Sequence, residues 1–213
     1  MDRHIWVLGT SGFAFDIANR FIKVPGAGNC FMGFLDDRKE NRQQFKSILR
    51  NNGMPYEVIS PDDLDSSDQK NRFLLGVGDP NYKFEFVKKY NISDDQIHDF
   101  RVDTNFADAA SIQSGIYFGC KISNLTSVGI GNFIDSQTVI AHECRIGNFN
   151  HIGVNVIIGG NSAIGCRNNI HSGAIIGNNI NIGDDCVIGA GATVLRDLPS
   201  GSKLVTPKSI KMN

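Results

Sequence analysis

The sequence predicts an α/β domain at residues 1–108 followed by a left-handed parallel β-helix of hexapeptide repeats at residues 109–213. The first observation behind this prediction is a strict period of six in the C-terminal half. Every sixth residue from Ile116 to Val194 is Ile or Val, and Gly follows eight of these fourteen residues. The second observation is that short apolar runs alternate with helix-like stretches in the N-terminal half.

A period of six is neither helical nor that of a flat strand, so each unit is interpreted as one face of a triangular coil. Three units close a coil, and residues eighteen apart stack at roughly 4.8 Å, the usual spacing between strands. The aliphatic residues then form an inward column. Three of the five cysteines, Cys120, Cys144 and Cys186, stand two residues before a column position, which predicts buried core residues and no disulfide framework.

The N-terminal half predicts a short parallel, Rossmann-like sheet. Strands are expected at residues 5–8, 31–35 and 73–77 and helices at 13–23 and 81–90, in a broadly βαβαβ order. Ligands of such sheets bind at the carboxyl ends of the strands. The candidate substrate-binding residues lie at those ends: Gly9, Thr10, Ser11, Gly12, Asp36, Asp37 and Gly78.

The loop from Gly9 to Gly12 reads G-x-x-G and lacks the middle glycine of a dinucleotide fingerprint. Because the loop opens a helix, its backbone N–H groups can bind a phosphate; the alternative is a tight turn without a ligand. Asp36 can accept hydrogen bonds from a ribose or a base, or it can cap a helix. Together these residues favour a nucleotide.

Composition excludes several classes of partner. The formal net charge of −1 gives no general attraction to nucleic acid, and no apolar run approaches the roughly 20 residues that a membrane span needs. The N-terminus runs directly into a strand pattern and does not resemble a secretory signal, so a cytoplasmic location is expected.

Histidines in the repeat region are the candidates for chemistry. His142-Glu143 follows Ile140, and Gly160 lies eighteen residues, one full coil, after His142. His151 lies nine residues, half a coil, after His142, so the two histidines are expected on opposite sides of one β-helix. They can share a site only between chains of a ring-shaped oligomer. Gly160 offers a backbone donor beside the base, or is simply a turn glycine.

The segment 139–152, with His142-Glu143-Cys144, Ile146-Gly147 and Asn150-His151, resembles the active-site segment of the sialic acid O-acetyltransferase-like family (NeuD/PglD type). That family includes bacterial enzymes that N-acetylate nucleotide-linked 4-amino sugars. The resemblance extends over nearly the whole chain, because residues 9–14, 33–37 and 76–79 are similar to the family's nucleotide-sugar domain in order and spacing.

The resemblance implies acetyl-CoA as co-substrate, no metal, and a homotrimer with active sites between subunits. It implies that His142 is the general base, that Glu143 orients it, that His151 lies near the acetyl carbonyl, and that the backbone of Gly160 donates to the thioester oxygen. Family geometry also implies contacts of CoA with Gly177, Gly189, Ala190 and Gly191. The expected reaction is N-acetylation of a nucleotide-linked 4-amino sugar.

Three alternatives stay open at this point. An O-acetyltransferase acting on sialic acid or another sugar hydroxyl would use the same base. A non-catalytic trimeric scaffold would bind a nucleotide sugar without transfer. A zinc enzyme of the γ-carbonic anhydrase type is disfavoured, because the gaps of nine, twenty and twenty-nine between His142, His151 and His171 are not multiples of eighteen.

Overall fold

A computed structural model describes residues 3–107 and 111–205 of the chain. The chain divides into two compact units, Met1–Phe100 and Arg101–Asn213. The predicted domain boundary between residues 108 and 109 lies outside the described residues. Within the described ranges, no helix is both long and apolar enough to cross a membrane.

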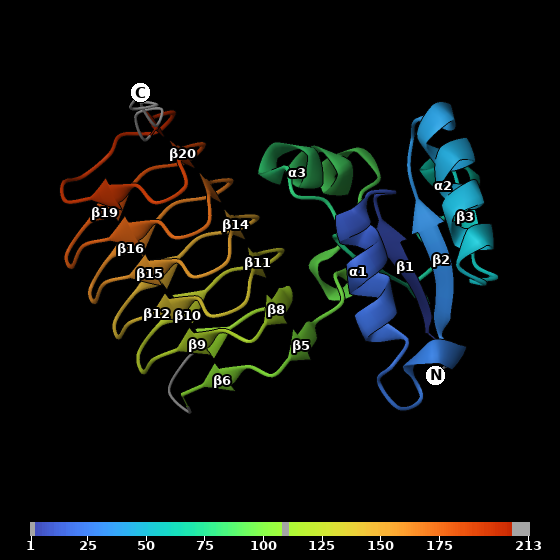
Figure 1. Ribbon diagram of the computed structural model, residues 1–213, viewed down its shortest axis with the longest axis horizontal. Coiled ribbons are helices and arrows are strands. Elements are labelled where there is room, and N and C mark those ends of the chain that lie inside the picture. The colour runs from blue at the N-terminus through green and yellow to red at the C-terminus, as the bar shows by residue number, and fades with distance from the viewer. Residues whose placement is uncertain (1–2, 108–110, 206–213) are drawn as a thin grey trace, which may run out of the picture. The chain divides into compact units, whose positions relative to one another are not determined.

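The N-terminal unit is built on a parallel sheet with strand order β3-β2-β1-β4 (Figure 1). Its strands are β1 (His4–Leu8), β2 (Phe31–Leu35), β3 (Glu57–Ile59) and β4 (Asn71–Leu74). Its helices are α1 (Gly12–Phe21), α2 (Lys39–Asn51) and α3 (Pro80–Lys89), and the short 3₁₀ turns are η1 (Ala27–Asn29), η2 (Pro61–Asp63) and η3 (Asp94–Gln96). Because β2 and β4 flank β1 on either side, strand order reverses there, and this is where such sheets bind ligands.

The predicted strands and helices are present, with two differences. The sheet has a further strand, β3, and a further helix, α2, which were not predicted from the sequence. Both carry weak signals, since β3 has three residues and α2 buries only Phe45 and Leu49. The third predicted strand ends at Leu74 and not at residue 77, because the chain turns at Gly76, whose N–H donates to the Leu74 carbonyl at 2.9 Å.

The C-terminal unit is a parallel β-helix, as predicted, and its coils rise one above another in Figure 1. Its strands form three parallel sheets, called here face 1, face 2 and face 3. Face 1 contains β6 (Asn105–Phe106), β9 (Lys121–Ile122), β12 (Val139–Ile140), β15 (Ile157–Ile158), β18 (Ile175–Ile176) and β21 (Thr193–Val194). Face 2 contains β7 (Ser111–Ile112), β10 (Ser127–Val128), β13 (Arg145–Ile146), β16 (Ala163–Ile164) and β19 (Asn181–Ile182). Face 3 contains β5 (Phe100–Val102), β8 (Ile116–Phe118), β11 (Phe133–Ile134), β14 (His151–Ile152), β17 (Asn169–Ile170), β20 (Val187–Ile188) and β22 (Lys203–Leu204).

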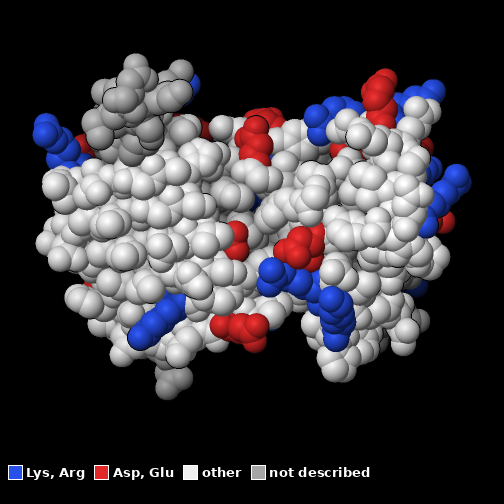
Figure 2. Space-filling view, in the orientation of Figure 1, with Lys and Arg blue, Asp and Glu red and all other residues white. Residues whose placement is uncertain are grey.

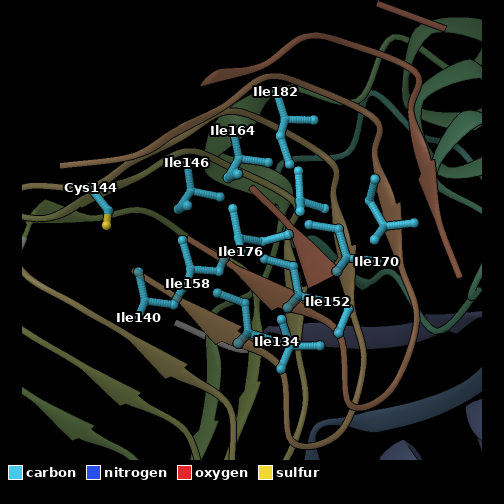
Figure 3. Packing of buried hydrophobic residues seen from close by; sticks show 14 of the residues in the cluster. Ile134, Ile140, Cys144, Ile146, Ile152, Ile158, Ile164, Ile170, Ile176 and Ile182 are labelled. Carbon is cyan, nitrogen blue, oxygen red and sulfur yellow. The ribbon is translucent and has the colours of Figure 1, made fainter. Parts of the chain in front are cut away.

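The inward column forms the core of this unit, and Figure 3 shows its isoleucines stacked in successive coils. Ile140 pairs with Ile158 and Ile158 with Ile176, which confirms the eighteen-residue spacing in the central coils. These three side chains are at most 1% exposed. Burial of branched aliphatic side chains on this scale is the main stabilisation that such a coil has.

The period fails at one predicted position. Ile134 pairs with Tyr117 and not with Ile116, which aligns instead with Phe133. Tyr117 therefore lies in the core cluster, from which Ile116 is absent. The corner between Tyr117 and Ile122 is one residue shorter than the repeat, and Gly119 makes the tight turn with a φ of 48°.

The three cysteines predicted as core residues are buried. Cys120, Cys144 and Cys186 are each at most 1% exposed. All five cysteines are free thiols, whereas Cys30 and Cys166 are partly exposed.

Candidate active site at one corner of the β-helix

The corner between face 1 and face 2 stacks Asn124, His142, Gly160 and Asn178 in successive coils, and is called here the His142 corner. Each coil turns here through a residue in left-handed conformation, such as Glu143 with φ 59° and Asn161 with φ 58°. The N–H of that residue donates to the preceding coil, as from Asn161 to the carbonyl of His142 at 3.0 Å. These bonds fix the backbone from which the His142 side chain projects.

His142 and Glu143 form the pair that the sequence predicted. The Nδ1 atom of His142 lies 2.9 Å from Oε2 of Glu143, and their side chains are 65% and 55% exposed. With the carboxylate at Nδ1, the favoured tautomer carries its proton there and leaves the Nε2 lone pair free. The imidazole is therefore arranged as a base that is open to a ligand.

Two consecutive glycines shape the floor under this imidazole. A Cβ atom on Gly160 would come 2.9 Å from both Cε1 and Nε2 of His142, so only glycine leaves room for the ring. A Cβ atom on Gly159 would come 2.5 Å from Oδ1 of Asn178. Because Gly160 has no Cβ, the imidazole of His142 from the preceding coil fits against it. Because Gly159 has no Cβ, the amide of Asn178 from the following coil fits there.

The backbone N–H of Gly160 is already hydrogen-bonded to the side chain of Asn178. The N–H of Gly160 donates to Oδ1 of Asn178 at 2.8 Å. The structure places Gly160 beside His142, as the eighteen-residue spacing predicted, but its N–H already has a partner. Sequence reasoning missed Asn178 and Gly159, although the same spacing, counted forward from Gly160, leads to Asn178.

The other two histidines lie elsewhere. His151 belongs to β14 on face 3, which is the side of the triangle opposite the His142 corner. Its ring stacks at 5.0 Å from the ring of Phe133. His171 lies at the corner between face 3 and face 1 and is exposed. Within one chain, the structure therefore brings neither histidine to His142.

The residues proposed for CoA contacts are divided between two corners. Gly177 directly precedes Asn178 in the His142 corner. Gly189, Ala190 and Gly191 follow β20 at the corner between face 3 and face 1. Gly191 has a φ of 67° and open space around its α-carbon, so its backbone is accessible.

In the N-terminal unit, the predicted loop and Asp36 lie together at the carboxyl ends of β1 and β2. The Thr10 hydroxyl donates to Oδ2 of Asp36 at 2.5 Å, and the Gly9 N–H donates to the Leu35 carbonyl at 2.7 Å. Ser11 caps α1, with its hydroxyl accepting from the N–H of Ala14 at 3.3 Å, and Gly12 begins the helix. The loop therefore presents a helix N-terminus, the arrangement that suits a phosphate.

Gly9 makes this loop tight. Its φ of 103° is a conformation that residues with a side chain rarely adopt, and a Cβ there would come 2.9 Å from the Gly76 carbonyl oxygen. Gly78, the remaining loop candidate, follows β4 and precedes α3. The loops after β1 and β4 thus pack backbone against backbone at the edge where the strand order reverses.

Asp36 is buried and its carboxylate is fully engaged. Oδ1 accepts from the backbone N–H and Nε of Arg38, and Oδ2 accepts from Thr10 and Nδ2 of Asn41. Burial alone would raise its pKa, but these hydrogen bonds and the charge of Arg38 outweigh burial and hold the pKa below its usual value. Of the two roles left open by the sequence, the geometry favours the structural one.

Asp37 is the more accessible carboxylate. It accepts a hydrogen bond from the Tyr82 hydroxyl at 3.0 Å. It also lines a cavity of about 280 Å³ with Tyr82, Glu85, Phe86, Lys89 and Tyr90 of α3 and its end. The aromatic residues were not identified from the sequence, although their spacing of four along a helix was a usable signal. A cavity of about 390 Å³ between α2 and β3 contains none of the candidate residues.

A metal site and a cysteine nucleophile find little support among these residues. Among the described residues, no group of three or more His, Cys, Asp or Glu side chains is arranged to hold a metal ion. Cys144, two residues from His142, is fully buried, and burial raises the pKa of its thiol. A buried, protonated thiol is a poor nucleophile.

Solved structures with this architecture are known, although no family model and no curated protein matches the sequence. A sugar acetyltransferase, PerB from Caulobacter crescentus, in complex with CoA and GDP-perosamine, is 19% identical with a TM-score of 0.75 over 98% of this chain and 97% of that one. The chain shares its fold. A mutant perosamine N-acetyltransferase from the same organism, also with CoA and GDP-perosamine, is 18% identical, covers 99% and 97% of the two chains, and has a TM-score of 0.73. The acetyltransferase domain of PglB from Neisseria gonorrhoeae, in complex with acetyl coenzyme A, is 18% identical, covers 97% of each chain and has a TM-score of 0.74.

Proposed function

We propose that this protein is an acetyl-CoA-dependent N-acetyltransferase that acts on a nucleotide-linked 4-amino sugar. The observation that carries the proposal is the His142 corner, where Glu143 lies 2.9 Å from Nδ1 and the Nε2 edge of the ring lies over Gly160. Support also comes from solved sugar N-acetyltransferases of the same fold that bind CoA and GDP-perosamine.

The reaction is a direct transfer with His142 as general base. The neutral amine of the sugar attacks the thioester carbonyl, the new C–N bond forms, and Nε2 of His142 takes the proton that the amine loses. Collapse of the tetrahedral adduct breaks the C–S bond. The proton on His142 then passes to the departing sulfur, so that N-acetyl sugar and CoA thiol are the products. Glu143 stabilises the imidazolium form of His142 between these steps.

The proposal places the site between subunits of a homotrimer. His151 lies on the face opposite His142, so a neighbouring chain would have to supply it to the same site. Face 1, which borders the His142 corner, exposes Val139, Ile157 and Ile175 at 37%, 43% and 42%. Figure 2 shows that the visible surface of this unit is largely uncharged. Such an apolar stripe suits contact with a second copy and with the pantetheine of CoA.

The nucleotide part of the substrate is assigned to the N-terminal unit. The N-terminus of α1, with Ser11 and Gly12, would bind the diphosphate through backbone N–H groups. Asp37 would accept hydrogen bonds from the base or ribose, whereas Asp36 holds Thr10 and the loop in place. Since acetyl-CoA and nucleotide sugars are both cytoplasmic metabolites, we expect the enzyme to act in the cytoplasm.

The decisive experiment is an acceptor panel. Release of CoA thiol from acetyl-CoA is measured with UDP-, dTDP- and GDP-linked 4-amino sugars, with the corresponding 4-hydroxy sugars and with free sialic acid. Turnover with a nucleotide amino sugar and none with the corresponding 4-hydroxy sugar supports the proposal. Acetylation of sialic acid alone would establish the hydroxyl alternative, and absence of thiol release with every acceptor would support a binding scaffold.

A further inference from the structure

The bond between Asn178 and Gly160 has a close counterpart at a different corner. At the corner between face 2 and face 3, Oδ1 of Asn148 accepts from the N–H of Ile130 at 3.0 Å, again across eighteen residues. Asp184 caps the N–H of Cys166 in the same way at 2.7 Å. In this chain, both Asn and Asp therefore serve as side-chain caps of a corner N–H.

The two corners differ in what surrounds the capped N–H. Ile130 carries a side chain, whereas Gly160 carries none, and the His142 imidazole lies 2.9 Å from where a Cβ on Gly160 would be. Gly160 is therefore the point where the candidate base and a backbone donor come together. An acyl carbonyl that reacts beside His142 would need a donor at this place, and the N–H of Gly160 is the backbone candidate that the eighteen-residue spacing predicted.

That donor is occupied in the free protein, because Asn178 holds it at 2.8 Å. A neutral hydrogen bond of this kind contributes only modestly to stability, since water or another acceptor can replace it. Asn178 is also exposed, so its side chain can turn towards solvent without opening the core.

We propose that Asn178 is a positioning residue that caps the Gly160 N–H in the free enzyme and releases it to the acetyl carbonyl of the bound thioester. The exchange conserves hydrogen bonds: the bond from Gly160 to Asn178 breaks, and the bond from Gly160 to the carbonyl oxygen forms. The Asn178 amide then bonds to water. No covalent step is added to the reaction, and the inference rests on the proposed function in assigning an acyl thioester to this corner.

Asn178→Asp tests the exchange directly. A carboxylate still accepts from the Gly160 N–H, but a charged acceptor holds it about twice as strongly. It also places negative charge beside the oxygen on which charge develops. We expect kcat/KM for acetyl transfer to fall by about 10²-fold, the range seen when one oxyanion donor is lost. Asn178→Ala removes the cap without adding charge, so it should lower kcat/KM by about three- to tenfold, the effect of one neutral hydrogen bond and far less than that of Asn178→Asp.

A binding measurement keeps the test independent of the sugar acceptor. Calorimetry compares CoA, which lacks the acyl carbonyl, with a stable acetonyl analogue of acetyl-CoA, which has it. Asn178→Asp should weaken the analogue by about tenfold relative to CoA, because the charge-assisted bond must break first. Asn148→Asp and Asn148→Ala are the matched controls and should leave the ratio of the two affinities unchanged.

Two outcomes would overturn the inference. If Asn178→Ala loses activity as severely as Asn178→Asp, the amide itself binds the carbonyl and no exchange takes place. If Asn178→Asp behaves like Asn148→Asp in both assays, the cap has no role in transfer. If wild-type protein binds both CoA ligands but acetylates no sugar, the proposed function fails while the binding ratio still decides the role of Asn178.

Discussion

Gly160 and His142 are matched in shape across one coil, since a Cβ on Gly160 would come 2.9 Å from two atoms of the imidazole ring. This is well inside the 3.5–4.0 Å at which carbon atoms pack. Gly160→Ala must therefore displace the ring from its position over the floor. We expect kcat to fall by about 10²-fold, because a shift of about 1 Å in a reacting group has effects of that size. Steady-state kinetics with the best acceptor measures the change.

A double-mutant cycle shows whether this effect runs through the histidine. If Gly160→Ala acts by moving His142, then His142→Ala combined with Gly160→Ala should be no slower than His142→Ala alone. An additive loss in the double mutant would instead assign Gly160 a separate role. Thermal unfolding of each variant serves as the folding control.

Glu143 combines a role at the site with an unfavourable backbone conformation. It has a φ of 59°, a region that Asn tolerates better than Glu. Glu143→Asn should therefore stabilise the β-helix by a few tenths to about 1 kcal/mol. The shorter side chain cannot hold Nδ1 of His142 as Glu143 does, so activity should fall by about tenfold, less than for a buried orienting acid. Urea unfolding and turnover, measured on the same samples, should change in opposite directions.

Asp36 should make stability depend on pH in the acid range. Its pKa is lower in the folded state than the ordinary value of 3.8, so its stabilising effect is complete above that value. The effect is lost as the pH falls through the lower, folded-state pKa. Asp36→Asn should cost about 1–3 kcal/mol at neutral pH, because an amide cannot accept the same four hydrogen bonds.

Urea unfolding at pH 7 and below pH 4 measures this contribution, with Asp37→Asn as the control. The deficit of Asp36→Asn relative to wild type should shrink in acid. A deficit that is equal at both pH values would mean that the carboxylate charge of Asp36 contributes nothing to the fold.

Cys144 should be dispensable for chemistry. It is fully buried, and its thiol donates towards the Gly159 carbonyl at 3.2 Å. Cys144→Ala should keep turnover within about threefold of wild type, because no covalent acetyl-enzyme is formed in direct transfer. Mass spectrometry of wild-type protein incubated with acetyl-CoA should detect no acetyl adduct on Cys144. A trapped thioester at this residue would require a two-step mechanism.

The β-helix was predictable from the sequence because a repeat of six marks the inward-facing position in every coil. Each coil must bury an aliphatic side chain, so Ile140, Ile158 and Ile176 were visible before the structure. The period failed at Ile116, where Tyr117 takes the inward place. A corner that is one residue shorter changes the register without changing composition, so counting along the chain did not reveal it.

The site was predictable in part for the same reason. Spacing by eighteen correctly placed Gly160 beside His142 and placed His151 away from it. The spacing could not predict which hydrogen bonds the side chains make. That Asn178 caps Gly160, and that Asp36 turns all its acceptors inward while Asp37 faces a cavity, depends on side-chain torsions. Such choices are decided by local packing and leave no period in the sequence.

The most direct test of the central claim compares wild-type protein with His142→Ala in acetyl transfer from acetyl-CoA to the best nucleotide-linked 4-amino sugar. With His142 as the general base, kcat should fall by about 10²–10⁴-fold, the contribution expected of such a group. Binding of CoA and thermal stability should be unchanged. Turnover by His142→Ala at the wild-type rate would contradict the assignment of the base and move the chemistry away from this corner.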